Sequence, residues 1–306
     1  MKTKKSTMSS QKKKDLIFYA CLLAFPLLQF FVMYVCVNFN SILLAFQHYD
    51  VVTEKYSFAF FENFERVFYL LFKSPDIGDA WKNSFLLYFI NTIIGVPMGL
   101  LFSFYIYKKM FFHGVFKVLL FLPSIISVVV MGLLYKYLLN NAIPELWMKL
   151  FDKQIYGWLR GDARLALYIF FALWMSLGPN ILMYVGAMSG ISESLSESAQ
   201  LDGCTKIQEF FYITIPCIYP TIVTFLVVGL VTVFTNQMYL YNLEPIRPDL
   251  SLYTFGYYMF RRTNLAAGNI SEYTELAAMG LTFTVVIVPV TLLFRKLLVK
   301  YGPSSY

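Results

Sequence analysis

Long apolar stretches alternate with short polar segments along almost the whole chain. A helix needs about 20 apolar residues to cross the hydrocarbon core of a bilayer, and stretches of that length recur here. Lipid leaves unpaired backbone groups without partners, and the stretches are too long and uniformly apolar for the strands of a barrel. The pattern predicts an all-α, polytopic membrane protein with six spans. These spans are predicted at residues 16–38, 83–107, 117–138, 165–190, 217–238 and 276–298.

The remaining residues fit around these spans. Residues 1–14 are rich in lysine and serine and are predicted to form a disordered basic tail. Residues 15–306 are predicted to form one transmembrane domain. The first span is expected to be retained, because its apolar core exceeds the roughly 7–15 residues of a cleaved signal peptide.

Composition and charge agree with a membrane chain. Hydrophobic residues make up 58% of the 306 residues and charged residues 14%. The net charge of +7 would also suit nucleic-acid binding, but its distribution argues against that partner. Positive charge gathers before the first span (six lysines), around the turn after the second (Lys108, Lys109, Lys117) and after the sixth (Arg295, Lys296, Lys300). This positive-inside pattern predicts a multi-pass protein of the cytoplasmic membrane with both termini in the cytoplasm.

Cysteine and histidine usage predicts neither a disulfide nor a metal site. Cys21 and Cys36 are fifteen positions apart on one predicted helix, which is beyond disulfide reach. Cys204 and Cys217 fall on the predicted cytoplasmic side, where thiols stay reduced. The two histidines lie far from any cysteine in the sequence.

Polar and aromatic residues gather in the fourth and fifth predicted spans. Residues 178–180 (Gly-Pro-Asn) predict a break in the fourth span, and broken helices near the bilayer centre are favoured substrate sites. Amides and hydroxyls suit the hydroxyl groups of a sugar, and aromatic rings suit its C–H face. Hydrogen bonding between helices and an interfacial aromatic belt are the alternative explanation. The substrate-path candidates are Asn180, Tyr184, Thr235, Asn236, Gln237 and Tyr239.

Residues 192–216 lie between the fourth and fifth predicted spans, on the predicted cytoplasmic side. Ser192 or Ser194 can cap a helix whose first turns carry Glu193 and Glu197, at the positive end of the helix dipole. Asp202-Gly203 then breaks this helix, because glycine readily adopts the left-handed conformation. A second helix restarts at Lys206, so the segment predicts helix, tight turn and helix, a shape that seats in a groove of another protein.

The order of residues in this segment resembles the "EAA" loop of permease subunits of type I ATP-binding-cassette carbohydrate importers. That is the family of binding-protein-dependent transport system inner-membrane components. Likeness continues upstream at Asn63-Phe64 and downstream at Ala277-Ala278, so it covers nearly the whole chain outside the tail. Ser198 and Cys204 depart from the alanines of the family. The residues at family positions in the loop are Glu197, Ala199, Asp202, Gly203, Phe210, Ile213, Pro216 and Pro220.

The resemblance implies a heterodimer of this chain and a second, different permease, which together form the translocation path. An extracellular solute-binding protein would deliver a sugar or oligosaccharide, and a cytoplasmic ATPase dimer would bind ATP and magnesium. The chain itself lacks a phosphate-binding loop, so no cofactor and no catalytic residue is expected in it. In this reading, Glu197, Ala199, Asp202 and Gly203 couple the permease to the ATPase.

Two other functions remain open at this point. Six spans also suit a self-contained secondary carrier, although the uncharged runs that form the body of the spans carry no ionisable partner of the kind that proton or sodium coupling commonly needs. A membrane-embedded enzyme is the third possibility. It is disfavoured because no grouping of Ser, His and Asp or of His, Asp and Glu falls within the spans.

Overall fold

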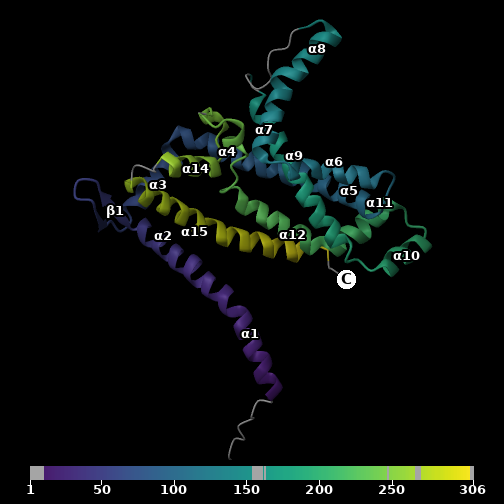
Figure 1. Cartoon of the computed structure of the whole chain (residues 1–306), viewed down its shortest axis with the longest axis horizontal. Coiled ribbons are helices and arrows are strands. Elements are labelled where there is room, and N and C mark those ends of the chain that lie inside the picture. The colour runs from purple at the N-terminus through teal and green to yellow at the C-terminus, as the bar shows by residue number, and fades with distance from the viewer. Residues whose placement is uncertain (1–9, 154–160, 162, 247, 266–269, 304–306) are drawn as a thin grey trace, which may run out of the picture. The chain divides into compact units, whose positions relative to one another are not determined.

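The computed structural model describes residues 10–153, 161, 163–246, 248–265 and 270–303 (Figure 1). Most of the predicted tail lies outside these residues. The described chain is helical apart from one two-stranded sheet, which confirms the predicted fold class. Five of its helices are long and apolar enough to cross a membrane: Ile17–Ala45, Ile77–Tyr107, Arg164–Met188, Lys206–Thr232 and Ser271–Tyr301.

The third predicted span is divided in two. Helix α6 (His113–Ile125) ends two residues beyond Pro123, and the backbone is extended at Ile126 before α7 (Val128–Tyr137) begins. The helix resumes through a π-helical turn into α8 (Ile143–Phe151), and the two arms are bent by 103°. If this bent pair crosses the membrane as one span, the described candidate spans number six.

Proline occurs inside several long helices without ending them. Proline lacks an N–H group, and its ring collides with the carbonyl four residues earlier in a regular α-helix. A π-helical turn widens the helix locally and relieves this conflict. Such turns precede proline at Asn91–Gly95 (Pro97), Leu138–Ala142 (Pro144) and Phe210–Thr214 (Pro216).

The fourth span is one uninterrupted helix, α9 (Arg164–Met188), so the predicted break at residues 178–180 is wrong. Gly178 serves close packing instead. A Cβ atom there would lie 3.0 Å from the Leu120 carbonyl oxygen and 3.0 Å from Ser124 Oγ, both on α6. The missing side chain therefore lets two helices approach each other and leaves α9 intact.

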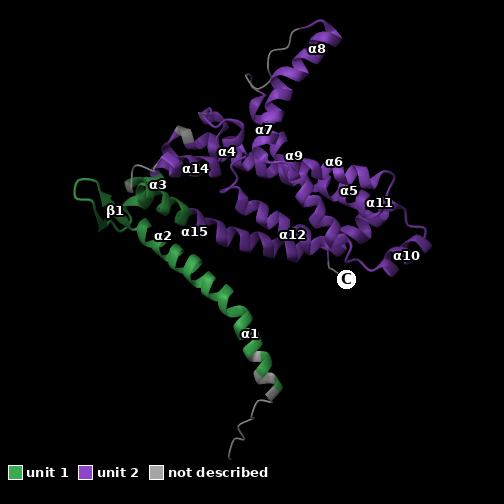
Figure 2. Cartoon of the chain, in the orientation of Figure 1, with its two compact units in different colours: residues 1–68, 266–282 green, residues 69–265, 283–306 purple. Residues whose placement is uncertain are grey.

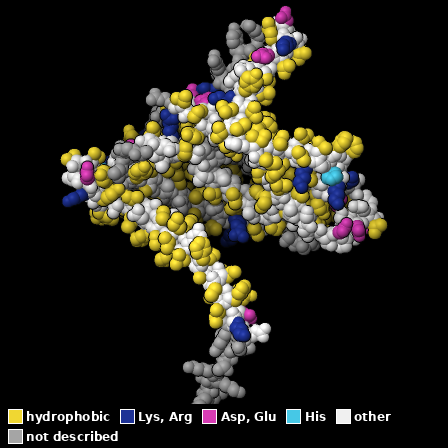
Figure 3. All heavy atoms as spheres, in the orientation of Figure 1, with side chains coloured by type: hydrophobic (Ala, Val, Ile, Leu, Met, Phe, Trp, Pro, Cys, Tyr) yellow, Lys and Arg dark blue, Asp and Glu magenta, His cyan; other side chains and the backbone are white. Residues whose placement is uncertain are grey.

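The described chain divides into two compact units (Figure 2). The first comprises residues 1–68 and 266–282. Its N-terminal helix runs from α1 (Ser10–Gln29) through a π-helical stretch into α2 (Val37–Ala45). Hydrophobic side chains cover this helix almost to its charged N-terminal end, and its apolar window has no buried residue (Figure 3).

A β-hairpin follows α2 in the first unit. Strand β1 (Gln47–Asp50) pairs antiparallel with β2 (Lys55–Phe58), with Tyr49 opposite Tyr56. The buried Asn63, at the start of α3 (Glu62–Lys73), donates to the Ala45 carbonyl at 3.0 Å and the Gln47 carbonyl at 2.8 Å. One amide thus fixes the end of α2 to the first strand. The N-terminal part of α15 (Ile270–Tyr301) completes this unit.

The second unit comprises residues 69–265 and 283–306 and holds the larger core. Helices α4 (Pro75–Ile90), α5 (Val96–Tyr107), α9 and α12 (Ile215–Thr232) pack together in it. Ser103 is fully buried between α5 and α9, and its hydroxyl lies 3.2 Å from the Ile181 carbonyl oxygen of α9. The short helices α13 (Leu240–Leu243) and α14 (Phe255–Leu265) follow α12.

Candidate functional site

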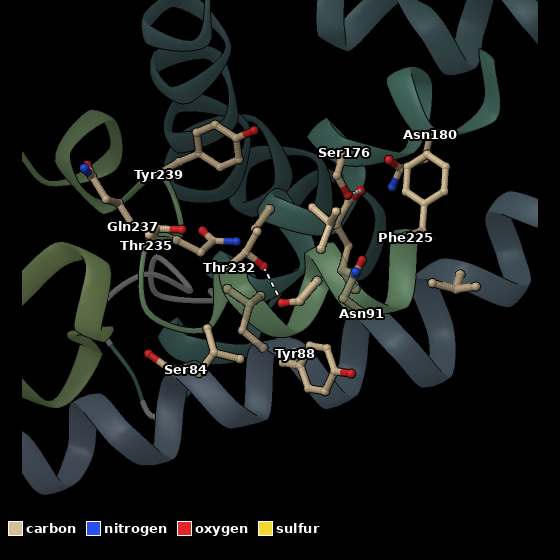
Figure 4. A pocket seen from close by; sticks show the side chains of 18 of the residues that line it. Ser84, Tyr88, Asn91, Ser176, Asn180, Phe225, Thr232, Thr235, Gln237 and Tyr239 are labelled. Atoms are coloured by element: carbon tan, nitrogen blue, oxygen red, sulfur yellow. Dashed lines mark hydrogen bonds between the residues drawn. The ribbon is translucent and has the colours of Figure 1, made fainter. Parts of the chain in front are cut away.

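A cavity of about 510 Å³ opens among the helices of the second unit (Figure 4). Its lining comes from α4, α9, α12 and the chain that follows α12. All six sequence-predicted path residues border this one cavity. The first and last of them, Asn180 and Tyr239, are more than fifty positions apart in the sequence. Its polar and aromatic lining residues are Ser84, Tyr88, Asn91, Ser176, Asn180, Tyr184, Phe225, Thr232, Thr235, Asn236, Gln237, Tyr239 and Asn242.

The side of the cavity made by α4 was not predicted. Ser84, Tyr88 and Asn91 are spaced four and three residues apart, so they lie on one face of a helix. This spacing was the available signal in the sequence. The irregular positions of this span, Gly95, Pro97 and Gly99, indicate kinking and close helix packing and not this polar face. Asn242 was missed as well, since it follows the predicted end of the fifth span.

The irregular backbone expected in the fourth span is found after α12. Residues 233–239 are not helical, and Met238 and Tyr239 have positive φ angles of 50° and 53°. Such angles are uncommon for residues other than glycine and are held by surrounding contacts. The Asn236 side chain provides one of them, because its Oδ1 accepts a hydrogen bond from the Met238 backbone N–H at 2.7 Å.

A glycine and a hydroxyl hold this segment in place. A Cβ atom on Gly256 would lie 2.4 Å from the Thr235 carbonyl carbon and oxygen, so only glycine permits this approach of α14. Thr254 donates to the Asn236 carbonyl oxygen at 2.6 Å. On the α4 side, Trp81 packs edge-to-face on Phe255, with 4.1 Å between the ring centroids.

The cavity lining contains no acidic, basic or histidine side chain among its described residues. Within the described part of the chain, the side-chain amides of Asn91, Asn180, Gln237 and Asn242 also have no hydrogen-bond partner. Amides offer both donors and acceptors. The site therefore presents free neutral hydrogen-bonding groups beside aromatic rings.

Charged groups are found beyond the cavity, around residues 240–252. Arg164 at the start of α9 donates to Asp249 at 2.8 Å, and Lys136 donates to the Leu243 carbonyl oxygen at 2.8 Å. The Ser251 backbone N–H bonds to the Asp249 carboxylate and, with Arg164, holds the pKa of Asp249 below its ordinary value. These bonds fasten the loop that follows the cavity.

The predicted helix–turn–helix is present at residues 193–214. Helix α10 (Glu193–Leu201) ends in a turn where the Cys204 N–H bonds to the Ala199 carbonyl at 2.9 Å and the Gly203 N–H bonds to the Gln200 carbonyl at 3.1 Å. This is the Schellman pattern, which needs a left-handed residue, and Gly203 supplies it with φ +78°. The next helix starts at α11 (Lys206–Glu209), where Thr205 and Gln208 form a capping box, and it continues into α12.

Helix α10 has two different faces. Glu193 and Glu197 are exposed, and Leu201 at its end is 89% exposed. Acidic side chains gather over this helix in Figure 3. Ser196 and Ala199 point the other way and are buried against the rest of the unit. Of the four predicted coupling residues, Glu197, Asp202 and Gly203 are therefore exposed, and Ala199 is not.

The buried face of α10 contains a polar cluster that sequence reasoning missed. Lys108, which directly follows α5, donates to Ser196 at 2.7 Å and forms an ion pair with Glu209 at the end of α11. Ser196 also donates to Glu209 at 2.6 Å. Lys108 is 88 and 101 positions from its two partners, so no local pattern could have revealed the cluster.

Membrane-length helices, a polar cavity among them and an exposed helix–turn–helix are features that suit a membrane transport subunit. The model of one family, "Binding-protein-dependent transport system inner membrane component", matches residues 78–300. The chain belongs to this family. It is the inner-membrane permease of a binding-protein-dependent ATP-binding-cassette importer, which confirms the predicted class of transport subunit. It is accordingly a multi-pass protein of the cytoplasmic membrane.

Relatives and a solved structure agree with this assignment. The arabinooligosaccharides transport system permease protein AraP of Bacillus subtilis (strain 168) is 24% identical over 282 residues, covering 88% of this chain and 85% of that protein. The lactose transport system permease protein LacF of Rhizobium radiobacter is 27% identical over 160 residues, 50% of this chain and 53% of that protein. The fold matches, with a TM-score of 0.76 and 24% identity, a chain in the crystal structure of a bacterial transporter that imports the acidic polysaccharide alginate. That match covers 95% of this chain and 97% of the other.

Proposed function

We propose that this permease carries an uncharged sugar or short oligosaccharide through the cavity beside residues 233–239. The observation that carries the proposal is the set of four unpartnered amides in a lining without charge. Sugar hydroxyls both donate and accept hydrogen bonds, and neutral amides match them in either role. The volume of about 510 Å³ lies within the range of roughly 300–1,000 Å³ usual for small-molecule sites.

The lining also favours a neutral sugar over an acidic one. A carboxylate moved into a cavity without a cationic partner loses its hydration and gains no compensating ion pair. Aromatic rings add a surface for the C–H face of a sugar ring. Tyr239 and Phe225 provide it on opposite sides of the cavity (Figure 4), and the Tyr184 ring, which also borders the cavity, lies 4.8 Å from that of Phe225. Relatives named for arabinooligosaccharide and lactose transport support the same substrate class.

Uptake by cells lacking this chain and complemented with it tests the substrate class. The probes are radiolabelled arabinotriose, lactose and maltotriose as neutral sugars, and trigalacturonate as an acidic one. Uptake of at least one neutral probe without uptake of trigalacturonate is expected. Trigalacturonate uptake equal to that of the neutral probes would contradict the proposal. Asn38, an exposed asparagine on α2 that is not among the cavity-lining residues, provides the matched control Asn38→Leu for variants of the lining amides.

We also propose how this permease contacts the ATPase that drives transport. The exposed face of α10 and the turn at Gly203 dock on one subunit of a separate cytoplasmic ATPase dimer, which binds ATP and magnesium. Glu197 pairs with the ATPase, Asp202 and Gly203 shape the turn, and Ala199 seats the helix on the permease. Both termini then lie in the cytoplasm, and a second, different permease completes the path among the membrane lipids.

Two substitutions test this docking. Glu197→Lys reverses a charge on the exposed face, and Gly203→Arg places a large side chain at a left-handed position. Both are expected to leave the chain in the membrane and to abolish uptake while ATP hydrolysis by the purified complex becomes independent of the binding protein. Normal uptake by both variants would exclude α10 as the docking element.

A further inference from the structure

We infer that Lys108, Ser196 and Glu209 form a polar tie that makes α10 and the cytoplasmic ends of two cavity-lining helices move as one body. This inference rests on the proposed docking of α10 on the ATPase. Lys108 and Glu209 are positioning residues in it: neither borders the cavity, and neither lies on the exposed face of α10.

The three side chains close a triangle. Lys108 donates to Ser196 at 2.7 Å, Ser196 donates to Glu209 Oε1 at 2.6 Å, and Lys108 contacts the same oxygen directly. Each of three separate elements contributes one corner: the end of α5, the middle of α10 and the end of α11. A displacement of any one element relative to the others breaks two of the three contacts.

Burial gives the tie its strength. The Lys108 side chain is 13% exposed and that of Glu209 5%. Around them, the Phe104 and Phe210 rings lie 5.0 Å apart, and the Lys108 ammonium lies 5.2 Å from the centre of the Tyr107 ring. A charge separated from its partner in such surroundings regains no hydration, so the triangle resists opening far more than an exposed ion pair does.

The elements joined by the tie lead directly to the cavity. Lys108 directly follows the helix Ile77–Tyr107, which carries Ser84, Tyr88 and Asn91 into the lining. Glu209 lies in the first turn of the helix Lys206–Thr232, which carries Thr232. A force applied to the exposed face of α10 therefore reaches two walls of the cavity through one closed set of contacts.

The accessibility of a cysteine placed in the cavity lining, called the reporter, tests this inference in the complex purified from its native membrane. The four natural cysteines are replaced by serine, and Thr235→Cys is labelled with a membrane-impermeant sulfonated maleimide. Labelling rates are compared without nucleotide and with ATP and vanadate, and ATP hydrolysis is measured in parallel. With the tie intact, the rate is expected to change with nucleotide.

Glu209→Gln and Lys108→Met are each expected to reduce this nucleotide-dependent change about fivefold or more, a loss typical of broken allosteric coupling, while ATP hydrolysis persists. The charge-swapped pair Lys108→Glu with Glu209→Lys preserves the triangle and is expected to restore the change. Lys109→Met is the matched control, because Lys109 is the exposed neighbour of Lys108. Ser196→Ala removes the hydrogen bonds that the Ser196 hydroxyl makes with Lys108 and Glu209 and keeps the ion pair between these two residues. It takes the place of a charge variant that fails to assemble.

The outcomes separate this inference from the proposed docking. If the reporter in the otherwise intact chain does not respond to nucleotide, the proposed docking fails. If it responds and Glu209→Gln responds equally, the tie is overturned. An apolar pair, Lys108→Met with Glu209→Leu, that responds as the intact chain does would likewise overturn it, because packing alone would then transmit the motion.

Discussion

The helix Lys206–Thr232 begins beside a buried ion pair and ends beside a cavity whose described lining is uncharged. At the first end, every polar group of the cluster is bonded to another: Lys108, Ser196 and Glu209 satisfy one another. At the second end, several amides have no partner within the described chain. Satisfied polar groups rigidify a structure, whereas unsatisfied ones facing a cavity are available to a ligand. One helix thus joins a cluster of satisfied polar groups to a cavity that presents free ones.

Lys108→Met should have the largest effect on stability. It leaves Glu209 buried without its cation, and loss of one partner of a buried pair costs about 3–5 kcal/mol. A clear fall in the melting temperature of the purified complex is expected. Adding Glu209→Leu should recover most of the loss, because an apolar pair of similar size removes the stranded charge. Equal melting temperatures for the single variant and the intact chain would show that the pair is not desolvated.

Gly256→Ala should disturb the cavity end by a different mechanism. The new Cβ meets the Thr235 backbone at 2.4 Å, and because backbone cannot turn aside as a side chain can, residues 233–239 must shift. Overpacking of this kind costs about 1–3 kcal/mol, and a large loss of uptake is expected with the chain still in the membrane. Gly78→Ala is the control, since nothing lies within 4 Å of its Cβ position. Uptake equal to that of the control would refute this role of Gly256.

Gly203→Ala should weaken the proposed docking of α10 on the ATPase without creating a steric clash. Its Cβ position is open, but φ +78° strains a residue with a side chain by about 1–2 kcal/mol. A lower ratio of uptake to ATP hydrolysis is expected. Gly203→Asn should lose less, because asparagine adopts the left-handed region more easily than alanine. If both variants behave alike, conformation at this turn is not what matters.

Gln237→Leu should lower affinity and leave the fold unchanged. The substitution removes one amide from the lining, and a neutral hydrogen bond is worth about 0.5–1.5 kcal/mol, or at most roughly tenfold in affinity. The expected result is a higher KM for uptake of the preferred neutral probe at an unaltered melting temperature. A loss of stability in place of a KM change would assign Gln237 a structural role.

Asp249→Asn should have the smallest effect, and it sharpens the contrast between exposed and buried ion pairs. The Asp249 side chain in its bond to Arg164 is 53% exposed, and such pairs contribute about 1 kcal/mol or less. The pKa of Asp249 is lowered in the folded chain, so its contribution is present above the ordinary carboxyl pKa and is lost as pH falls through the lowered value. Melting temperatures of the variant and the intact chain should therefore differ slightly at neutral pH and converge in acid.

Sequence reasoning reached the cavity through residue chemistry, although one of its structural premises was wrong. It proposed Asn180 and Tyr184 because a Gly-Pro pair predicted a broken helix, yet α9 is continuous and Gly178 serves packing on α6. Both residues nevertheless border the cavity. The irregular backbone lies after α12, in the polar run from Thr235 to Tyr239, and not in the fourth span where it was predicted.

The sequence by itself determined the class of fold and the helix–turn–helix at residues 193–214. Both depend on local signals: apolar length for the spans, and a glycine after a capped helix for the turn at Gly203. Only the tertiary structure decided that Lys108 meets Glu209 and that Ser84, Tyr88 and Asn91 border the cavity. Lys108 and Glu209 are 101 positions apart in the sequence, and the spacing of Ser84, Tyr88 and Asn91 places them on one helix face without indicating what that face meets.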